Sequence, residues 1–370
     1  MERTDVVIVG GGVMGTAAAR ALGARGRATI LLERFELGHA RGSSGGPTRN
    51  FRLTYHDPLY VRMARASLER WRRLEAEAGV ELLRVVGGLD IGEAAIRVSG
   101  AALEAAGESF ERPSAAEATE RWPRLLLEGR TLLYQPEGAI IRADHAIAAQ
   151  ARSAAATGAE IREGVTVRSI RPAGDGVEVL TFEGEAIEAS AAIVAAGGWA
   201  PSLLADADVR LPLRILQEQS TVFDAEPELA TTPTVIDWEA WSDRFPYIVP
   251  NAFAPGEIKV GIHLSGPVVD PDTRSFDPDA DREAQALGWV GRLVSPPPTP
   301  SHTESCLYSV TPDEDFVLDR VGPIVVASPC SGHGFKFAPL VGEIVASLAT
   351  GEEPPVPLDR FRLDRRALRP

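Results

Sequence analysis

The segment Asp5-Val-Val-Ile-Val-Gly-Gly-Gly-Val-Met-Gly15 constrains the fold of this chain more than any other stretch. The apolar run from Val6 to Val9 predicts a strand that is buried on both faces, as in a parallel sheet. It leads into Gly10 to Gly15, which fits the pattern G-x-G-x-x-G. An alanine-rich helix from Thr16 to Ala24 and a second apolar strand from Ala28 to Leu32 follow. This order of elements predicts a Rossmann-like unit.

The glycine turn has the features of a dinucleotide-binding site. Gly10 permits the tight turn, Gly12 lets the backbone approach a pyrophosphate, and Gly15 allows the helix to pack closely on the strand. The helix N-terminus offers free N–H groups and a partial positive charge to the anion. Glu33 lies 23 residues beyond Gly10, where a carboxylate can accept the ribose hydroxyls of an unphosphorylated dinucleotide. The motif leaves NAD and FAD both open, and a glycine-rich turn in an ordinary α/β domain is the alternative.

Length and apolar content place the chain among globular proteins. Its 370 residues give room for two domains, or for one domain with a large insertion. The hydrophobic content of 44% is ordinary, and no apolar run approaches the ~20 residues that span a bilayer. The first strand starts at residue 5, which leaves no room for a signal peptide ahead of it. We therefore expect a cytoplasmic protein that does not bind a membrane.

Charge and metal-binding residues narrow the function. The net charge of −14 disfavours nucleic acid as a partner, because phosphate binding requires a basic face. It allows an anionic small molecule, since a few buried Arg and Lys residues can set the local field. Cys306 and Cys330 form no C-x-x-C pair, and the six His residues show no zinc-ligand spacing. The sequence predicts no metal site.

A Gly/Ser-rich loop and a long helix follow the first unit. The loop from Gly38 to Arg49 contains Arg41 and is followed by Arg52, so that it suits a phosphate or a carboxylate. A flexible surface loop is an equally good interpretation of its composition. Apolar residues at helical spacing then predict an amphipathic helix from Pro58 to Ala78, whose stripe is more typical of a core than of a cofactor site.

The remaining segments predict an interrupted α/β domain. Helix Asp144 to Thr157, strand-like Glu160 to Ile170 and the buried strand from Ala191 continue the first pattern. Strand-like Leu83 to Ile91 and the alternating residues after 212 predict a separate antiparallel sheet instead. The predicted fold class is α/β, a Rossmann-like cofactor domain with an inserted α+β substrate domain. We expect residues 1–80, 145–211 and 305–370 in the cofactor domain, and 81–144 and 212–304 in the substrate domain.

Five motifs occur in one order along the chain. They are Gly10 to Gly15, Thr48-Arg49-Asn-Phe-Arg52, Lys259-Val-Gly-Ile-His263, Cys306-Leu-Tyr308 with Thr311-Pro-Asp-Glu-Asp-Phe316, and Ser331-Gly-His-Gly-Phe-Lys336. In this combination the chain resembles monomeric sarcosine oxidase and N-methyltryptophan oxidase, flavoenzymes of the D-amino-acid-oxidase-like group. The resemblance covers nearly the whole chain, and the two last motifs are far more specific than the glycine turn.

The resemblance implies FAD as the cofactor, with a covalent link from Cys306 to the flavin 8α-methyl group. The alternative for Cys306 is the usual role of a free cysteine, a small buried hydrophobic side chain. Cys330 stands where the oxidases carry an aromatic residue, and for it we keep this structural interpretation. The residues that match FAD-binding positions are Gly10, Gly12, Val13, Met14, Gly15, Glu33, Arg34, Ser43, Thr48, Arg49, Val167, Cys306, Gly332, Gly334 and Lys336.

The resemblance also implies roles around the flavin ring. Lys259 matches the lysine that promotes reaction with oxygen, where a fixed cation would stabilise superoxide. Arg52 and Lys336 match residues that bind the substrate carboxylate, an anion that a guanidinium fork and a second cation suit well. The remaining matches line the pocket or lie near the ring, and they are Tyr247, His263, Tyr308 and Arg49. A solvated strand lysine and a satisfied core histidine are the alternatives for Lys259 and His263.

We therefore predict an FAD-dependent oxidase that acts on the secondary amine of a small carboxylate, such as sarcosine or another N-methyl or cyclic amino acid. A hydride equivalent would pass to flavin N5, the imine would hydrolyse, and oxygen would be reduced to peroxide. The alternatives are an oxidase of a bulkier amine, a flavin dehydrogenase, and a binding protein without turnover. Ser43 to Pro47, Ile262 and Asp237 to Phe245 depart from the family pattern and leave the substrate open. The resemblance suggests a monomer.

Overall fold

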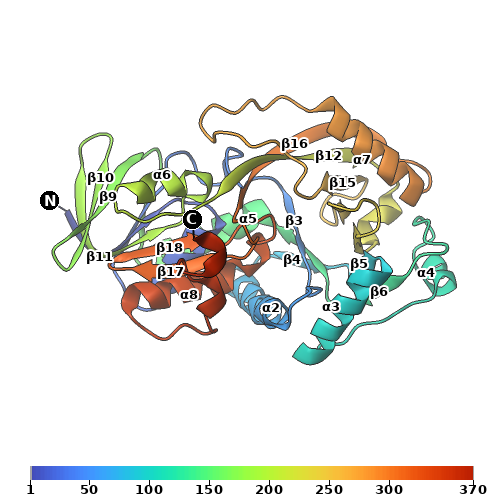
Figure 1. Cartoon of the computed structure of the whole chain (residues 1–370), viewed down its shortest axis with the longest axis horizontal. Helices are drawn as coiled ribbons and strands as arrows, with labels where there is room; N and C mark the ends of the chain where they lie inside the picture. The colour runs from blue at the N-terminus through green and yellow to red at the C-terminus, as the bar shows by residue number, and fades with distance from the viewer. Residues whose placement is uncertain (1, 370) are drawn as a thin grey trace.

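The computed structural model describes residues 2–369, which form an elongated molecule with a sheet towards each end (Figure 1). One end carries the sheet built around the first strand, β1 (Glu2–Val9). The other end carries the sheet built around β12 (Arg214–Asp224). Among the described residues, no helix combines the length and the hydropathy that crossing a membrane requires.

The first sheet has eight strands and a parallel centre. Parallel pairing joins, in spatial order, β18 (Ile324–Ser328), β11 (Ala186–Val194), β1, β2 (Thr29–Leu32) and β8 (Glu160–Arg162). Antiparallel strands extend it, with β17 (Val317–Val321) beside β18 and the hairpin β9 (Val167–Ala173) and β10 (Gly176–Thr181) beside β11. The sheet confirms the predicted Rossmann-like arrangement.

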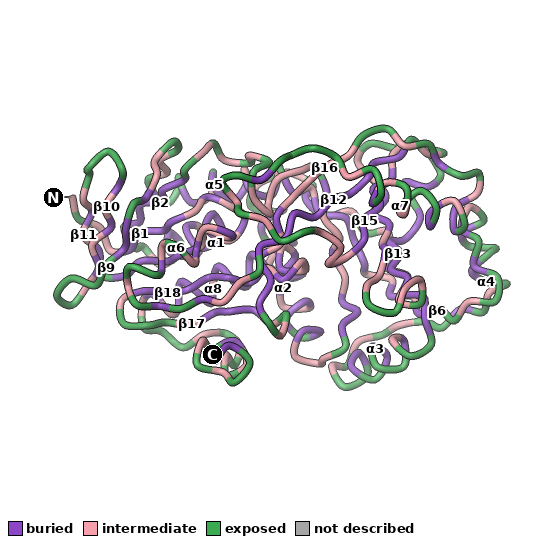
Figure 2. Tube along the Cα trace, turned by 45° about the horizontal axis from the view of Figure 1, so that its top comes forward, coloured by how far each residue is buried: buried purple, intermediate pink, exposed green. Residues whose placement is uncertain are grey.

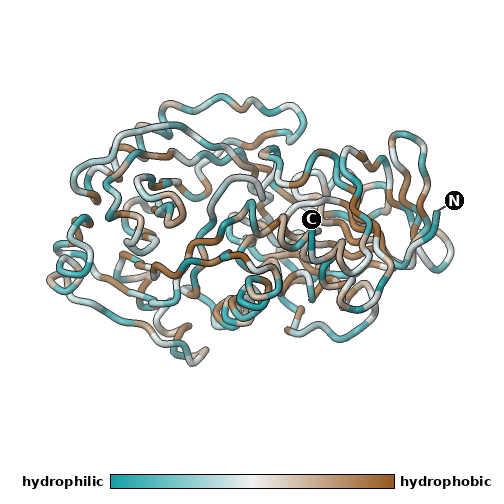
Figure 3. The backbone as a smooth tube through the Cα atoms, turned by 180° about the vertical axis from the view of Figure 1, so that it is seen from behind, coloured by the Kyte–Doolittle hydropathy of each residue, from teal (hydrophilic) through white to brown (hydrophobic). Residues whose placement is uncertain are grey.

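Strand β1 is buried on both faces, as its apolar run predicts. Val6 and Ile8 pack into the core on the side of helices α1 (Val13–Gly23) and α8 (Ala338–Thr350). Val7 and Val9 pack into a second core, which includes Ala200 and Leu204 of α6 (Ala200–Ala205). Successive side chains of a strand point to opposite faces, so a strand that is covered on both faces must be apolar at successive positions. Figure 2 shows this burial along β1, β11 and β18, and in Figure 3 the strands at this end are predominantly hydrophobic.

The second sheet has seven strands and is mostly antiparallel. Its order is β16 (Thr299–Val310), β12, β15 (Glu257–Ile262), β14 (Pro246–Pro250), β13 (Thr234–Asp237), β5 (Gly88–Ile91) and β6 (Leu132–Gln135). One pair, β13 with β5, is parallel, which the sequence did not indicate. Helix α7 (Ala280–Leu293) packs on this sheet through the buried Trp289 and Val290.

A small sheet and the remaining helices join the two ends. Strand β7 (Ala139–Arg142) lies between β3 (Thr48–Phe51) and β4 (Leu83–Val85). The long helix α2 has the predicted bounds, Pro58–Ala78; Asp57 caps its N-terminus, and Gly79 ends it in the left-handed conformation. The other helices are α3 (Glu93–Ala106), α4 (Ala115–Arg121) and α5 (Ala143–Ala156).

Two predicted strands are each divided by a glycine with positive φ. Residues 160–170 form β8 and β9, because Gly164 has a φ of 74° and its amide bonds to Phe35 instead of continuing the strand. Residues 83–91 form β4 and β5 in different sheets, and Gly87, with a φ of 83°, lies between them. A boundary at residue 305 would fall inside β16, which continues from 299 to 310. The expected division into a cofactor domain and a substrate domain stays a prediction.

Close packing of helices α1 and α8 depends on glycine. Gly342 of α8 is buried against α1, and a Cβ there would lie 2.5 Å from the carbonyl oxygen of Ala17. Gly288 lies on the exposed side of α7, where the nearest atom to an added Cβ would be 4.0 Å away. The two positions are both helical and differ in the space around them.

We expect Gly342→Ala to lower the free energy of unfolding by about 1–3 kcal/mol, because the methyl group forces the two helices apart. Gly288→Ala should raise it by about 0.4–1 kcal/mol, since alanine loses less backbone entropy in a helix. Urea unfolding followed by circular dichroism measures both. Equal effects of the two substitutions would contradict the close contact of α1 and α8.

Candidate functional site

One cavity of about 1130 Å³ extends between the two large sheets. At one end it reaches the glycine turn after β1 and the end of β2, and at the other it reaches the inner face of the seven-stranded sheet. Strand β3 lines it between these ends. Every predicted site residue lines this cavity except Gly15.

The glycine turn forms a cradle at the N-terminus of α1. A Cβ on Gly10 would lie 2.6 Å from the carbonyl oxygen of Ala195, and Gly10 has a φ of 106°. Gly12 is the N-cap of α1 and has no side chain, and the amide of Val13 in the first turn donates instead to Ser44 Oγ at 3.1 Å. Gly15 has a packing role instead, because its Cβ would lie 1.8 Å from the carbonyl oxygen of Gly10.

Glu33 is held rigidly at the end of β2. It is buried, and its carboxylate accepts hydrogen bonds from the amides of Gly11 at 2.6 Å and Phe35 at 2.8 Å. Burial by itself raises the pKa of Glu33, but hydrogen bonds from His39, Phe35 and Gly11 outweigh it and the pKa is lowered. An ionised acceptor therefore stands beside the cradle. Arg34 and Val167 line the same end, and Arg34 pairs with Asp272.

Alternate residues of the seven-stranded sheet make the opposite wall. Lys259 of β15 lies beside Val249, and Gly261 lies beside Tyr247, in neighbouring strands. Glu304, Cys306 and Tyr308 occupy every second position of β16 and all line the cavity. Glycine makes room for the rings, since a Cβ on Gly261 would lie 2.3 Å from Tyr247.

Lys259 is a buried cation in the middle of this wall. Its Nζ donates a hydrogen bond to the carbonyl oxygen of Thr48 at 2.9 Å and lies 3.5 Å from Oε2 of Glu304. Burial lowers the pKa of Lys259, and the Glu304 carboxylate opposes that shift. Arg49 lies nearby, with its guanidinium donating to the carbonyl oxygens of Thr48 at 2.8 Å and Ser43 at 2.9 Å.

Arg52 and Lys336 place two positive groups together. Lys336 is 5% exposed, and its Nζ donates to the carbonyl oxygen of His333 at 2.8 Å. Burial lowers the pKa of Lys336 well below its usual value, and the charge of Arg52 adds to this effect. The Arg52 guanidinium lies 4.4 Å from the ring centre of Tyr55. Within residues 2–369, no carboxylate forms an ion pair within 4.0 Å of either group, so the pair can accept an external anion.

His263 and two tyrosines lie on the same side of the cavity. The His263 ring stacks on Phe245 at 4.5 Å, and Tyr308 is 5.6 Å away. Burial, together with Arg52 and Lys336, lowers the pKa of His263 to about 3, so its imidazole is neutral. Burial raises the pKa of Tyr247 to about 12 and raises the pKa of Tyr308 well above its usual value. The tyrosine hydroxyls are therefore protonated hydrogen-bonding groups.

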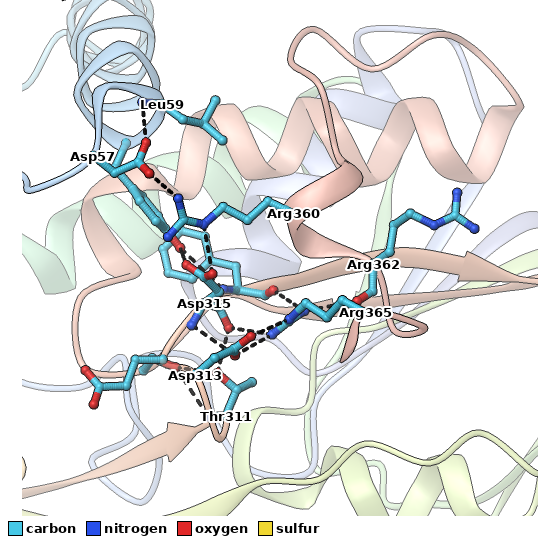
Figure 4. Close-up of polar contacts among 12 residues, drawn as sticks. Asp57, Leu59, Thr311, Asp313, Asp315, Arg360, Arg362 and Arg365 are labelled. Carbon is cyan, nitrogen blue, oxygen red and sulfur yellow. Dashed lines mark hydrogen bonds and ion pairs between the residues drawn. The ribbon is translucent and has the colours of Figure 1, made fainter. Parts of the chain in front are cut away.

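An ion-pair network fixes one rim of the cavity (Figure 4). Asp57 accepts from the amide of Leu59 at the start of α2 and also pairs with Arg360. Arg360 donates to Asp315 at 2.8 Å, and Arg365 pairs with Asp313 at 2.7 Å. The motif from Thr311 to Phe316 is thus tied to the C-terminal segment and to α2, which is a role that the sequence did not indicate.

A family model described as FAD dependent oxidoreductase, DAO, matches residues 5–348. The chain belongs to this family. It is 33% identical to monomeric sarcosine oxidase from Streptomyces avermitilis, over 99% of this chain and 98% of that one. It is 32% identical to a probable sarcosine oxidase from Arabidopsis thaliana, over 94% of this chain and 88% of that one. Among solved structures it is similar to NikD, an unusual amino acid oxidase essential for nikkomycin biosynthesis, with a TM-score of 0.85, 26% identity and 98% coverage of both chains.

The protein is therefore an FAD-dependent oxidoreductase, and the residues present fit that cofactor. The glycine cradle would receive the pyrophosphate, because Gly10, Gly12 and Met14 line the cavity at the N-terminus of α1 and the glycines let the backbone face it without side chains. Glu33 is positioned to accept from a ribose. The cavity continues without interruption from this cradle to Cys306, as a long dinucleotide requires. Within the described residues, no group of three or more His, Cys, Asp or Glu residues could hold a metal ion.

Three residues of the site had no role assigned from the sequence. Trp238 and Phe245 belong to the segment from Asp237 to Phe245, which the sequence indicates only as a departure that helps shape the cavity, and their ring centres are 4.1 Å apart. Nothing in the sequence analysis indicated Glu304, which faces Lys259. The i, i+2 spacing of Glu304 from Cys306 could have revealed the last. The composition contains a further indication of the site. Only two of the 38 Lys and Arg residues are lysines, and both, Lys259 and Lys336, line the cavity.

The depressed pKa of His263 predicts a pH-dependent loss of stability. The unfolded chain binds a proton at His263 near its ordinary pKa of ~6.5, whereas the folded chain does not until about pH 3. Its contribution is therefore lost as the pH falls from about 6.5 to 3, by up to ~1.4 kcal/mol per pH unit. Urea unfolding from pH 7 to 4 should show a shallower slope for His263→Asn. His145→Asn, at the half-buried start of α5, is the control for replacing a histidine by asparagine; parallel curves for wild type and His263→Asn would contradict a neutral His263.

Proposed function

We propose that this FAD-dependent oxidoreductase oxidises the secondary amine of a small carboxylate, such as sarcosine, another N-methyl amino acid or a cyclic imino acid. The observation that carries the proposal is the pair Arg52 and Lys336, two positive groups in one cavity with no ion-paired carboxylate from the described chain. A buried cation without a counter-ion is costly, so this arrangement is best explained by an anionic ligand.

The side chains around that pair would orient the substrate. Arg52 and Lys336 would bind its carboxylate, which leaves the amine on the side of His263 and Tyr308. Neutral His263 can accept a hydrogen bond from the amine N–H, and the Tyr308 hydroxyl can donate to or accept from it. Carbon oxidation requires the neutral amine, and the positive charges of Arg52 and Lys336 would favour loss of its proton.

FAD, when bound, would supply the redox chemistry, as acceptor of the hydride equivalent from the carbon next to nitrogen and donor of the electrons to oxygen. Lys259 would supply a fixed positive charge at the wall that faces the cofactor. Such a charge stabilises the anion that forms when the first electron reaches oxygen. Two relatives that cover most of this chain are named sarcosine oxidases, which supports the same reaction class. The name of one also supports a monomer.

A larger, ring-bearing amine is a second candidate substrate. Trp238 and Phe245 form an aromatic wall that continues into the stacked ring of His263. The Arg52 guanidinium also lies 5.8 Å from the Trp238 ring centre, so the wall adjoins the proposed carboxylate site. A planar heterocycle would stack well there.

A panel of amines tests both candidates. We expect peroxide release with one or more of sarcosine, N-methyltryptophan, proline and pipecolate, measured by a coupled peroxidase assay. The methyl ester or amide of the active compound should lose about 10- to 150-fold in kcat/KM, because it lacks the charge that Arg52 and Lys336 bind. Lys336→Met should remove most of this preference, whereas Arg3→Met, on an exposed side chain, should not. Equal turnover of acid and ester would contradict the proposed orientation.

We also propose that Cys306 carries the flavin covalently. Cys306 lines the cavity on the same strand face as Tyr308, and the cations Arg49 and Lys259 lie close enough to lower the pKa of its thiol. Burial exceeds their effect and raises that pKa to about 11. The second thiol, Cys330, receives a hydrogen bond from the amide of Ser309 at 3.4 Å and serves as the control.

Acid precipitation distinguishes a covalent from a dissociable flavin. The wild-type pellet should stay yellow, and the intact mass should exceed that of the chain by one FAD. Cys306→Ser should give a colourless pellet, while Cys330→Ser should behave as the wild type. A yellow pellet from Cys306→Ser, or a colourless one from the wild type, would rule out this attachment.

A further inference from the structure

The two lysines of this chain occupy the same cavity in different charge environments. Lys259 is 3.5 Å from the Glu304 carboxylate, and this is the one ion pair within 4.0 Å that the described residues give it. Lys336 has no carboxylate within that distance and bonds to the carbonyl oxygen of His333. All other basic residues of the chain are arginines. Arginine stays charged wherever it is buried, whereas lysine can lose its proton. The charge of each lysine is therefore set by its neighbours.

The groups around Lys259 come from four strands. Its neighbours in the sheet, Val249 of β14 and Val222 of β12, are apolar. Strand β3 contributes the Thr48 carbonyl and the Arg49 guanidinium, and β16 contributes Glu304 and Cys306. Arg49 acts against protonation of Lys259, and burial acts in the same direction. Glu304 is the one carboxylate that opposes them.

The carboxylate of Glu304 forms no ion pair within 4.0 Å in residues 2–369 other than the one with Lys259. The guanidinium of Arg49 donates to the carbonyl oxygens of Ser43 and Thr48, and no ion pair joins it to Glu304 within 4.0 Å in residues 2–369. Both groups nevertheless lie against the same glycine, with Nη1 of Arg49 3.4 Å and Oε2 of Glu304 3.6 Å from the place of a Cβ on Gly46. A Cβ at this position would be in van der Waals contact with both groups, which places the carboxylate and the guanidinium on the same side of the loop.

We propose that Glu304 is a positioning residue that keeps Lys259 protonated and fixes the direction of its ammonium group towards the Thr48 carbonyl. Lys259 bridges two strands through these contacts, since Thr48 is on β3 and Glu304 is on β16. The consequence for catalysis rests on the proposed role of Lys259 in the reaction with oxygen. Glu304 acts through Lys259, and its side chain does not need to touch the substrate.

The presence of only two lysines makes the test direct. The holoenzyme is labelled with lysine carrying ¹³C at Cε, so that NMR shows two side-chain signals whose shifts report protonation as the pH changes. Lys336→Arg retains the positive charge and leaves one signal, which assigns the spectrum. Glu304→Gln should lower the pKa of Lys259 by about 1 to 3, the usual effect of losing an opposite charge at this distance. The pKa of Lys336 should stay unchanged in the same sample.

Reoxidation of the photoreduced holoenzyme by oxygen is the second readout, and it requires no amine substrate. In Glu304→Gln its rate constant should equal that of the wild type at low pH and fall about tenfold per pH unit above the lowered pKa of Lys259. The control Glu188→Gln removes the same charge from an exposed pair with Arg3 and should change neither readout. Should Glu304→Gln not fold, Glu304→Ala replaces it, because the side chain is 27% exposed and its removal opens no sealed cavity.

An unchanged pKa of Lys259 in Glu304→Gln would overturn the inference. A lowered pKa with an unchanged reoxidation rate at every pH would support the role of Glu304 and would instead refute the proposed oxygen role of Lys259. Failure of every amine in the substrate panel leaves both readouts measurable, so an error in the substrate is distinguished from an error about Glu304.

Discussion

Uncompensated positive charge at the junction of the two sheets is the constraint on which the site depends. Lys336, Arg52 and Arg49 donate hydrogen bonds to backbone carbonyls, and none of them is ion-paired within 4.0 Å to a carboxylate of residues 2–369. Carbonyl dipoles hold a cation in place without cancelling its charge, so the field remains available to a ligand. Burying such groups is costly. Packing of the two sheets must therefore offset the unfavourable free energy of burying these charges, and binding of the proposed substrate carboxylate would reduce it.

The backbone that holds these cations is fixed by close contacts. A Cβ on Gly332 would lie 2.4 Å from the ring of Tyr308 and 2.6 Å from that of His263, so the loop can approach both rings only as glycine. On the rim, Arg360 ties the N-terminus of α2 to Asp315 (Figure 4). Both features bring the C-terminal third of the chain onto elements formed much earlier in the sequence. The site is consequently an assembly of rigid parts and does not rest on one loop.

Three acid–base groups on the substrate side, His263, Tyr247 and Tyr308, are uncharged at neutral pH. Burial makes His263 neutral and keeps the two tyrosines, Tyr247 and Tyr308, protonated. Lys259 has a carboxylate partner and Lys336 does not. The cavity thus contains Lys259, which has a carboxylate of the protein beside it, and Lys336, which has none within 4.0 Å among residues 2–369. That difference would let the same residue type serve oxygen at one position and substrate at the other.

The sequence by itself determined the Rossmann-like unit, because the glycine turn, the two-sided apolar strand and the capped helix α2 are set by local sterics and periodicity. It also indicated the family, and it pointed to Lys259, Lys336 and Cys306 as site residues because they stand in short motifs. Tertiary structure alone decided which of them meet: the positions 49, 259 and 304 lie on three strands, and no local pattern encodes their spacing. It divided two predicted strands at Gly87 and Gly164, because the positive φ of each glycine interrupts the extended backbone that the apolar residues favour. It also paired Lys259 with Glu304, because side-chain charges interact through space and the order of strands in a sheet is a property of the whole fold.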